Sequence, residues 1–243
     1  MKLDGLKALW GKAFGDSEEM IELFFQTAYA PQRCRYLEEG GQVTSALYWM
    51  DAVAYGQKLA YIYGVATDPD HRGKGLCRKL MEKTHEDLAE QGCSGAILMP
   101  AEPGLRKMYA SMGYQECSTM GSFACQAGDA VAVRRIDREE YALLRRKYLP
   151  EGGVIQEGES LAYLQTYAQF YAGEDFLLAA VHETDSLFGV ELLGNQAAAP
   201  GILKAMGYEQ GTFRTPDGET PFAMYLPLTE NAKKPTYLGL AFD

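Results

Sequence analysis

The spacing of apolar residues changes several times along the chain, and each spacing predicts one type of element. Residues 7–30 have helical spacing, and Asp16 and Ser17 within them are typical helix N-cap residues. Residues 33–69 predict strands separated by glycine turns, and Glu-Gly-Gly-Gln at 39–42 is the clearest hairpin signal. The first part of the chain is therefore expected to be helical and then to form antiparallel strands.

An apolar stripe with a period of four residues predicts a helix over residues 75–90. The stripe consists of Leu76, Leu80, Thr84 and Leu88. A short buried strand at 94–100, a helix at 102–114 and a closing hairpin at 115–126 are expected to follow. This order of elements predicts a mixed α/β domain that ends near residue 127.

One segment of this domain has an echo in the second half of the chain. Residues 103–116 and 200–210 both begin with Pro-Gly, pass through a short helical stretch, and continue with Met-Gly-Tyr and a predicted strand. The second copy is three residues shorter, which is about one helical turn. Because the flanking elements have the same order, we expect a degenerate duplication, with domains at 1–127 and 128–243.

The second half predicts further helices and strands around the repeated segment. Helices are expected at 137–150 and 158–172, strands at 175–183 and 187–194, and a hairpin at 208–228 whose turn is Pro-Asp-Gly. Four aromatic residues have helical spacing in the second of these helices: Tyr163, Tyr167, Phe170 and Tyr171. Packing against a sheet is the expected role for most of them.

Composition narrows the class of protein. The chain has 243 residues, of which 47% are hydrophobic, and a formal net charge of -10, which argues against nucleic acid as a partner. The five cysteines are odd in number and form no Cys-x-x-Cys pair, so we expect reduced thiols, no disulfide framework and no metal site. No signal peptide or membrane-spanning run is recognisable, which favours a cytoplasmic location without membrane binding.

A glycine-rich loop stands between a predicted strand and the helix at 75–90. It reads Asp-Pro-Asp-His-Arg-Gly-Lys-Gly over residues 68–75. Unsatisfied N–H groups at a helix N-terminus, with glycines that allow close approach, suit a phosphate or pyrophosphate. The spacing fits neither a P-loop nor the Gly-x-Gly-x-x-Gly loop of dinucleotide-binding folds. A plain turn with solvated cations is the alternative.

The segment Val-Ala-Thr-Asp-Pro-Asp-His-Arg-Gly-Lys-Gly-Leu-Cys, residues 65–77, resembles motif A of the GCN5-related N-acetyltransferase (GNAT) superfamily. That pattern is Arg/Gln-x-x-Gly-x-Gly/Ala, and Cys77 departs from its last position. Residues 107–114, Lys-Met-Tyr-Ala-Ser-Met-Gly-Tyr, resemble a second family motif. The resemblance implies a GNAT fold in residues 1–127, a degenerate GNAT-like domain after it, and a tandem layout loosely similar to Eis-type acetyltransferases.

The resemblance also implies acetyl-CoA as cosubstrate and assigns residues to it. The pyrophosphate would lie on backbone N–H groups of the loop and helix start, at Arg72, Gly73, Lys74, Gly75, Leu76 and Cys77. The pantetheine would pair with the strand that carries Val65, Ala66 and Thr67, like an added strand. Gly64 in the same strand fits a β-bulge that would splay the sheet.

The general acid in this family is a tyrosine at the position of Tyr109. A phenol with a pKa near 10 is protonated at neutral pH and can donate a proton to a departing thiolate. In the repeated segment Leu203 stands at the equivalent position, and that half also has no glycine loop. We therefore expect one active site, in the first half.

The general base is open between four candidates. Glu102 stands at the start of the helix that carries Tyr109, His71 stands in the loop, and a chain of water molecules could serve instead. The fourth candidate is the C-terminal carboxylate of Asp243, because the apolar end of the chain is expected to be buried. An edge strand of the second domain is the alternative for this tail.

The function expected from this resemblance is acetyl transfer from acetyl-CoA to a primary amine, directly within a ternary complex. The acceptor would be a small molecule or a peptide, and the second half would wall its pocket. Two alternatives remain: a non-catalytic CoA-binding or regulatory module, and an acyltransferase for longer acyl chains. Oligomeric state has no signal in the sequence.

Overall fold

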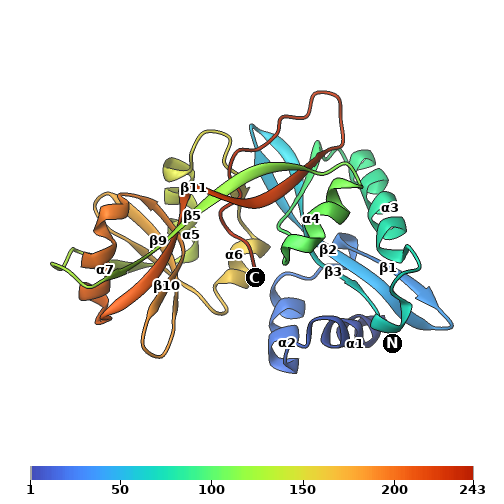
Figure 1. Ribbon diagram of the computed structural model, residues 1–243, viewed down its shortest axis with the longest axis horizontal. Coiled ribbons are helices and arrows are strands. Elements are labelled where there is room, and N and C mark those ends of the chain that lie inside the picture. Colours follow the sequence, from blue (N-terminus) through green and yellow to red (C-terminus); the bar gives the residue numbers. More distant parts are fainter. Residues whose placement is uncertain (1, 243) are drawn as a thin grey trace. The chain divides into compact units, whose positions relative to one another are not determined.

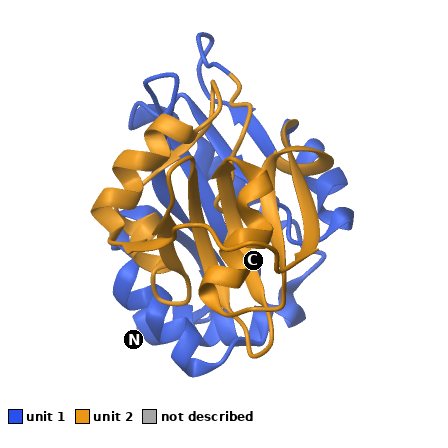
Figure 2. Ribbon diagram, turned by 90° about the vertical axis from the view of Figure 1, so that its left-hand side faces the viewer, with its two compact units in different colours: residues 1–115, 224–233 blue, residues 116–223, 234–243 orange. Residues whose placement is uncertain are grey.

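The computed structural model describes residues 2–242 and divides the chain into two compact units. The first unit comprises residues 1–115 and 224–233, and the second comprises residues 116–223 and 234–243 (Figure 2). Each unit is therefore built from two separate stretches of the chain. The domain boundary expected near residue 127 stays a prediction.

The first unit begins with two helices where the sequence predicts one. They are α1 (Lys2–Phe14) and α2 (Glu18–Thr27) (Figure 1). Gly15 has a left-handed backbone with φ 78°, which ends the first helix. The Ser17 hydroxyl then accepts a hydrogen bond from the backbone N–H of Met20 at 3.3 Å and caps the second. The N-cap expected here is confirmed.

The sheet of the first unit has the strand order β1-β2-β3-β4-β11. Its strands are β1 (Cys34–Glu39), β2 (Gln42–Ala54), β3 (Gln57–Thr67), β4 (Gly95–Leu98) and the end of β11 (Gln210–Pro227), with a short 3-10 turn (Pro31–Arg33) before β1. The strands β1, β2 and β3 are antiparallel, whereas β4 runs parallel to β3. The hairpin predicted at 39–42 is confirmed, since β1 and β2 pair on either side of Gly40 and Gly41.

Helices cover both faces of this sheet. Along β2, Tyr48 contacts the ring of Trp10 from α1, with ring centroids 5.3 Å apart. Its neighbours Leu47 and Trp49 point to the other face, because side chains alternate along a strand. There they share a core with α3 (Leu76–Glu90) and α4 (Pro103–Ala110), to which Leu80 and Tyr109 belong. The fold class expected from the sequence, a mixed α/β fold with a mixed sheet, is confirmed.

In the second unit the strand order is β11-β10-β9-β8-β6. Its strands and helices are β5 (Gln115–Gln126), β6 (Arg134–Ile136), α5 (Arg138–Tyr148), β7 (Ile155–Gln156), α6 (Glu159–Leu164), β8 (Gln169–Ala172), β9 (Phe176–His182), β10 (Leu187–Gly194), a 3-10 turn (Gln196–Ala198), α7 (Ala199–Met206) and the start of β11. The face that contains Leu178 and Phe213 packs against Ile202 of α7. On the other face the ring of Tyr141, from α5, stacks on Phe170 at 4.3 Å.

The long second helix predicted at 158–172 is wrong. Helix α6 ends at Leu164, and residues 169–172 form strand β8. Phe170 and Tyr171 are therefore successive strand residues that point to opposite faces of the sheet. The helical spacing of the aromatic residues was misleading, because residues 163 and 167 lie in a helix and a turn while the other two lie in a strand.

Two predicted hairpins are also wrong, since residues 115–126 and 210–227 each form one continuous strand. The two strands, β5 and β11, pair with each other. At their contact a Cβ on Gly121 would lie 2.1 Å from the carbonyl oxygen of Asp217, and one on Gly218 would lie 2.1 Å from the backbone nitrogen of Gly121. These glycines permit a close approach of two backbones, so Pro-Asp-Gly here is part of a strand.

A buried ion pair holds the end of the chain in the second unit. The guanidinium of Arg145 donates to Glu191 at 2.7 and 2.9 Å, and it also donates to the backbone carbonyl of Leu238. The hydroxyls of Tyr141 and Tyr237 donate to the same carboxylate. The tail up to residue 242 is thus buried, as expected, but apart from one isolated bridge at Tyr237 it forms no strand in the described residues.

None of the helices in residues 2–242 has the length and apolar character needed to cross a membrane.

Candidate functional site

A β-bulge interrupts strand β3 within the segment that the sequence links to ligand binding. Ala46 of β2 pairs with Ala66, and Tyr48 pairs with Tyr63, so two residues of β3 face one residue of β2. Gly64 lies in this bulge with φ 57°. A Cβ there would lie 2.9 Å from the ring of Trp10, so both the backbone angle and the available space require glycine. The expected bulge is confirmed.

Beyond the bulge, strand β3 has lost its partner on one side. The parallel pairing with β4 extends from Leu59 to Tyr61 among the described residues. Val65 and Thr67, further along β3, are half-buried, and Ala66 is buried. The end of β3 therefore offers a free edge, to which an extended ligand can bind as an added strand.

The loop after β3 has the backbone geometry that a phosphate site needs. A short 3-10 turn (Pro69–His71) leads into Gly73 and Gly75, which have φ 77° and 74°. A Cβ on either glycine would meet nothing within 4 Å, so packing does not explain their presence. Positive φ angles next to open space leave the backbone of the loop accessible to a ligand.

The helix that follows begins without a side-chain cap. The N-cap residue of α3 is Gly75, which has no side chain that could accept a hydrogen bond from the first N–H groups of the helix. The first N–H groups of α3, at Leu76 and Cys77, have no partner within the helix and carry the positive end of its dipole. Lys74 is exposed and forms no ion pair with any residue from 2 to 242. Glycines, N–H groups and this cation together fit a pyrophosphate.

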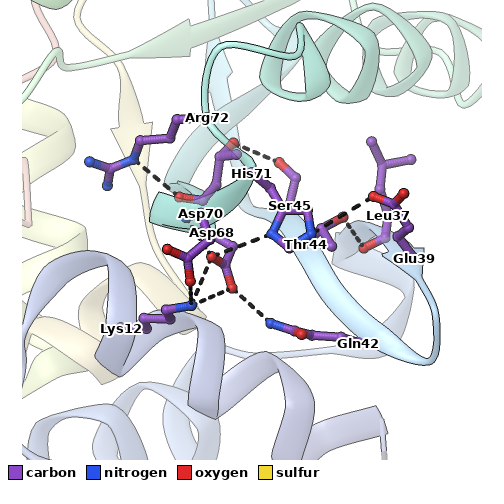
Figure 3. Close-up of polar contacts among 11 residues, drawn as sticks. Lys12, Leu37, Glu39, Gln42, Thr44, Ser45, Asp68, Asp70, His71 and Arg72 are labelled. Carbon is purple, nitrogen blue, oxygen red and sulfur yellow. Dashed lines mark hydrogen bonds and ion pairs between the residues drawn. The ribbon is translucent and has the colours of Figure 1, made fainter.

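Asp68 anchors the loop to two other elements (Figure 3). Its carboxylate accepts hydrogen bonds from the ammonium group of Lys12 at 2.9 and 3.0 Å and from the Gln42 side chain at 2.8 Å. It also accepts from the backbone N–H of Asp70 at 2.8 Å and so caps the 3-10 turn. The hydrogen bond from Lys12 is the main reason that the pKa of Asp68 falls to about 2.

Two further contacts tie the loop to the end of β3. The Arg72 guanidinium donates to the carbonyl oxygen of Thr67 at 3.3 Å. The ring of His71 lies 3.5 Å from a carboxylate oxygen of Asp68 and 3.8 Å from Glu39, and only 21% of its side chain is exposed. His71 therefore packs against the base of the loop.

Tyr109 lies on α4, in the same core as the start of α3. Its ring is buried, with 6% exposure, and Val65 and Cys77 pack against that core. The pKa of the Tyr109 phenol is raised well above its usual value. Burial is the main cause, and the nearby Cys77 is the second. Among the described residues the hydroxyl has no hydrogen-bond partner, so its proton is available to a ligand.

The helix that carries Tyr109 is fixed to the helix that begins at the loop. The guanidinium of Arg78, in the first turn of α3, donates to the hydroxyl of Ser111 at 2.7 Å and to its carbonyl oxygen at 3.1 Å. Ser111 is the C-cap residue of α4, two residues after Tyr109. These bonds hold the phenol in position relative to the glycine loop.

The structure does not connect the Glu102 carboxylate to this phenol. Glu102 is the exposed N-cap residue of α4, and its side chain forms no hydrogen bond to any residue from 2 to 242. It stands seven residues before Tyr109, which is about 10 Å along a helix axis. Asp243 lies outside the described residues. The roles predicted for both stay predictions.

Sequence reasoning missed Lys12, Gln42 and Asp68, which shape the loop without belonging to its glycine motif. One local signal was present, since an aspartate directly before a proline is a typical start of a helical turn. The partners of Asp68 could not be found this way, because they lie 26 and 56 residues away in the sequence.

Comparisons with known proteins agree with this geometry. Residues 1–117 match the model of the acetyltransferase (GNAT) domain. Among curated proteins, no sequence matches the chain. The fold is similar to that of a GCN5-related N-acetyltransferase from Kribbella flavida, with 19% identity over 92% of this chain and 68% of the other, and a TM-score of 0.69.

Two further solved structures share the fold. A GCN5-related N-acetyltransferase from Anabaena variabilis has 12% identity, covers 94% of this chain with 71% of its own, and gives a TM-score of 0.73. The Eis1 protein of Mycobacterium abscessus has 11% identity over 93% of this chain and 71% of the other, and a TM-score of 0.68. At these identities the likeness concerns the fold alone.

Proposed function

We propose that this protein, whose residues 1–117 match the model of the acetyltransferase (GNAT) domain, is a GNAT acetyltransferase that transfers the acetyl group of acetyl-CoA to a primary amine. The observation that carries the proposal is the uncapped start of α3 behind Gly73 and Gly75, next to the core that holds Tyr109. A turn that only connects a strand to a helix would not explain why the space around these glycines is open. It also would not explain the phenol without a hydrogen bond in the adjacent core.

Residues of the loop would bind the cosubstrate by its pyrophosphate. The N–H groups from Arg72 to Cys77 would donate to phosphate oxygens, and Lys74 would add a positive charge. The free edge of β3 at Val65, Ala66 and Thr67 would hold the pantetheine by backbone hydrogen bonds. When bound, acetyl-CoA supplies an activated acetyl thioester. A backbone N–H of this edge would polarise the thioester carbonyl.

Tyr109 would act as the general acid. Its raised pKa keeps the phenol protonated at neutral pH, and protonation is the state that a proton donor needs. The phenol would deliver its proton to the thiolate sulfur as the carbon–sulfur bond breaks. The amine nitrogen forms the new bond to the acetyl carbon and loses a proton to the base, for which Glu102, His71, water and Asp243 remain the candidates.

The loop assignment is tested by calorimetric titration with acetyl-CoA. The Gly75→Glu variant should lose binding, because a carboxylate would stand where the phosphates lie. Gly15→Glu is the matched control, since Gly15 also has a positive φ, 78°, and open space, but lies at the end of α1. Loss of binding in both variants, or in neither, would contradict the assignment.

The acid assignment is tested by Tyr109→Phe. We expect kcat to fall by about 10²–10⁴, the usual contribution of a general acid, while acetyl-CoA binding is retained. Tyr114→Phe is the control, because this buried phenol in the same core is bonded to His85 at 2.8 Å. Unchanged kcat in Tyr109→Phe would refute the role. Tight acetyl-CoA binding without acetylation of any amine would instead support the non-catalytic CoA-binding module.

The role of the chain end is tested by a C-terminal extension. If the Asp243 carboxylate is the base, an added tag should lower kcat strongly, whereas Glu102→Gln should leave kcat unchanged. The reverse pattern would assign the base to Glu102. Retention of activity in both proteins would favour a water chain.

A further inference from the structure

The second unit contains a pocket that the proposed acetyl transfer does not use. Its volume is about 520 Å³, which is within the range of small-molecule sites. Strand β6, the first residue before α5, the turn after α6 and the start of β8 form its walls. The polar side chains that line it belong to Arg135, Asp137, Gln165, Thr166, Tyr167 and Gln169. All of them lie within residues 116–223, so the pocket belongs to one unit.

Arg135 provides a cation without a counter-ion in the wall of this pocket. Its neighbours on the chain are paired, since Arg134 binds Glu140 and Arg138 binds Glu139. No ion pair or hydrogen bond engages the Arg135 guanidinium among residues 2–242, and the side chain is exposed. Arginine at such a position offers a planar fork of donors, which matches a carboxylate.

A hydrogen-bond chain holds Gln169, a second possible donor in the wall of this pocket. The hydroxyl of Tyr171 donates to the side-chain oxygen of Gln169 at 2.7 Å and lies 2.6 Å from Nε2 of His182. The other ring nitrogen of His182 lies 2.8 Å from the hydroxyl of Tyr208. Because the Gln169 oxygen is engaged, its NH₂ group is left as a donor, and it has no partner among the described residues.

Arg135 lies close to the hydrogen-bond chain and affects the protonation of His182. In the pairing of β6 with β8, Arg135 stands opposite Tyr171, so their side chains share a face. Burial lowers the pKa of His182, and the positive charge of Arg135 lowers it further. Because the Tyr171 hydroxyl donates its proton to Gln169, it accepts from Nε2–H of a neutral His182. The Nδ1 atom then accepts from the Tyr208 hydroxyl.

The remaining walls are mainly polar, and they present one exposed aromatic ring. The backbone N–H groups of residues 165–168 all donate to carbonyls of α6, so they cannot bind a ligand. The carboxylate of Asp137 accepts from the backbone N–H of Glu140 at 2.8 Å as the N-cap of α5. The ring of Tyr167 is 41% exposed and is held edge-on by Tyr163 at 5.8 Å. An aromatic ring of a ligand can pack on it.

We propose that this pocket binds a small aromatic carboxylate, with its carboxylate group on Arg135 and the Gln169 amide and its ring on Tyr167. The site is separate from the acetyl-CoA loop and does not depend on the proposed transfer. The net charge of -10 disfavours anions in general, so binding must come from these local donors.

The experiment compares two probes that differ only in one group, a carboxylate or the neutral amide of the same shape. N-acetyl-phenylalanine carries a carboxylate, and N-acetyl-phenylalaninamide is neutral. Neither has a free amine, so neither can accept an acetyl group, and binding is measured apart from catalysis. Calorimetry on the full chain should show that the carboxylate binds about tenfold or more tightly than the amide, which is the size expected for charged hydrogen bonds.

Three variants assign the preference to residues. Arg135→Gln should abolish it, whereas Arg134→Gln, a change of the paired neighbour outside the pocket, should retain it. Gln169→Leu should weaken carboxylate binding by several-fold. Arg135 has no bonded partner in the described residues, so thermal unfolding of its variant should match that of the wild type. Equal binding of the two probes, no binding of either, or a preference retained in Arg135→Gln would overturn the proposal.

Discussion

The ammonium group of Lys12 lies within 3.0 Å of both carboxylate oxygens of Asp68. It also lies 2.7 Å from Asp70, so one lysine of α1 binds two residues around the start of the glycine loop. The contact makes the position of the loop dependent on a helix that begins the chain. Because the Asp68 side chain is buried, with 1% exposure, water cannot easily replace the hydrogen bonds that Lys12 donates to its carboxylate.

Asp68→Asn tests this dependence. We expect a higher KM for acetyl-CoA with a smaller change in kcat, because the loop backbone loses its anchor while Tyr109 is not touched. Asp70→Asn is the control, since Asp70 is 77% exposed and shares the same lysine. Equal effects of the two substitutions on KM would contradict a special role for Asp68.

The same carboxylate predicts a pH dependence of stability. The pKa of Asp68 is lowered from 3.8 to about 2 in the folded chain. Its charge therefore stabilises the fold above pH 3.8, and this contribution is lost as the pH falls to about 2. The stability difference between wild type and Asp68→Asn, measured by denaturant unfolding, should shrink across this window. A constant difference would show that the charge is not the cause.

Gly64→Ala should destabilise the first unit strongly. The φ of 57° is unfavourable for alanine, and the new Cβ would lie 2.9 Å from Trp10 and 3.0 Å from Tyr48. We expect a loss on the order of 3 kcal/mol, from backbone strain together with overpacking. Gly104→Ala, in the exposed first turn of α4 with open space around it, should cost nothing. Urea unfolding of both variants measures the contrast.

These residues also show what the sequence alone could predict. Local signals located the hairpin at 39–42, the loop at 68–75 and the bulge at Gly64, because each depends on the conformations that nearby residues permit. The strands at 115–126 and 210–227 were misjudged because their pairing connects residues far apart in the chain. For the same reason Asp68 was not recognised, since its role depends on the approach of Lys12 and Gln42.

His85 predicts a second pH effect, at milder acidity. Its Nε2 lies 2.8 Å from the hydroxyl of Tyr114, and burial lowers its pKa from 6.5 to about 4. Below pH 6.5 the unfolded chain takes up a proton that the folded chain does not, so stability falls until about pH 4. In His85→Gln this part of the loss should vanish. An unchanged pH profile between 6.5 and 4 would refute the assignment.

Arg145→Met should be among the most damaging substitutions in the second unit. It would leave the buried carboxylate of Glu191 without its cation, for which a loss of about 3–5 kcal/mol is usual. Adding Glu191→Gln should restore part of the stability, because the unpaired charge is removed. One of the Tyr141 and Tyr237 hydroxyls can still donate to the amide oxygen, and the other can accept from the new NH₂ group. Denaturant unfolding should show that the double variant is more stable than Arg145→Met alone.

Strand β11 has a consequence for the order in which the protein can be made. Its first residues pair with β10, at Gly211–Phe213, while its last residues pair with β4, at Met224–Pro227. Met224 also belongs to the core that contains Tyr109. On the ribosome, the sheet of the first unit must therefore keep an open edge at β4 until residues 224–227 have emerged. The core around Tyr109 would be completed only after the intervening residues of the second unit, 116–223, have been synthesised.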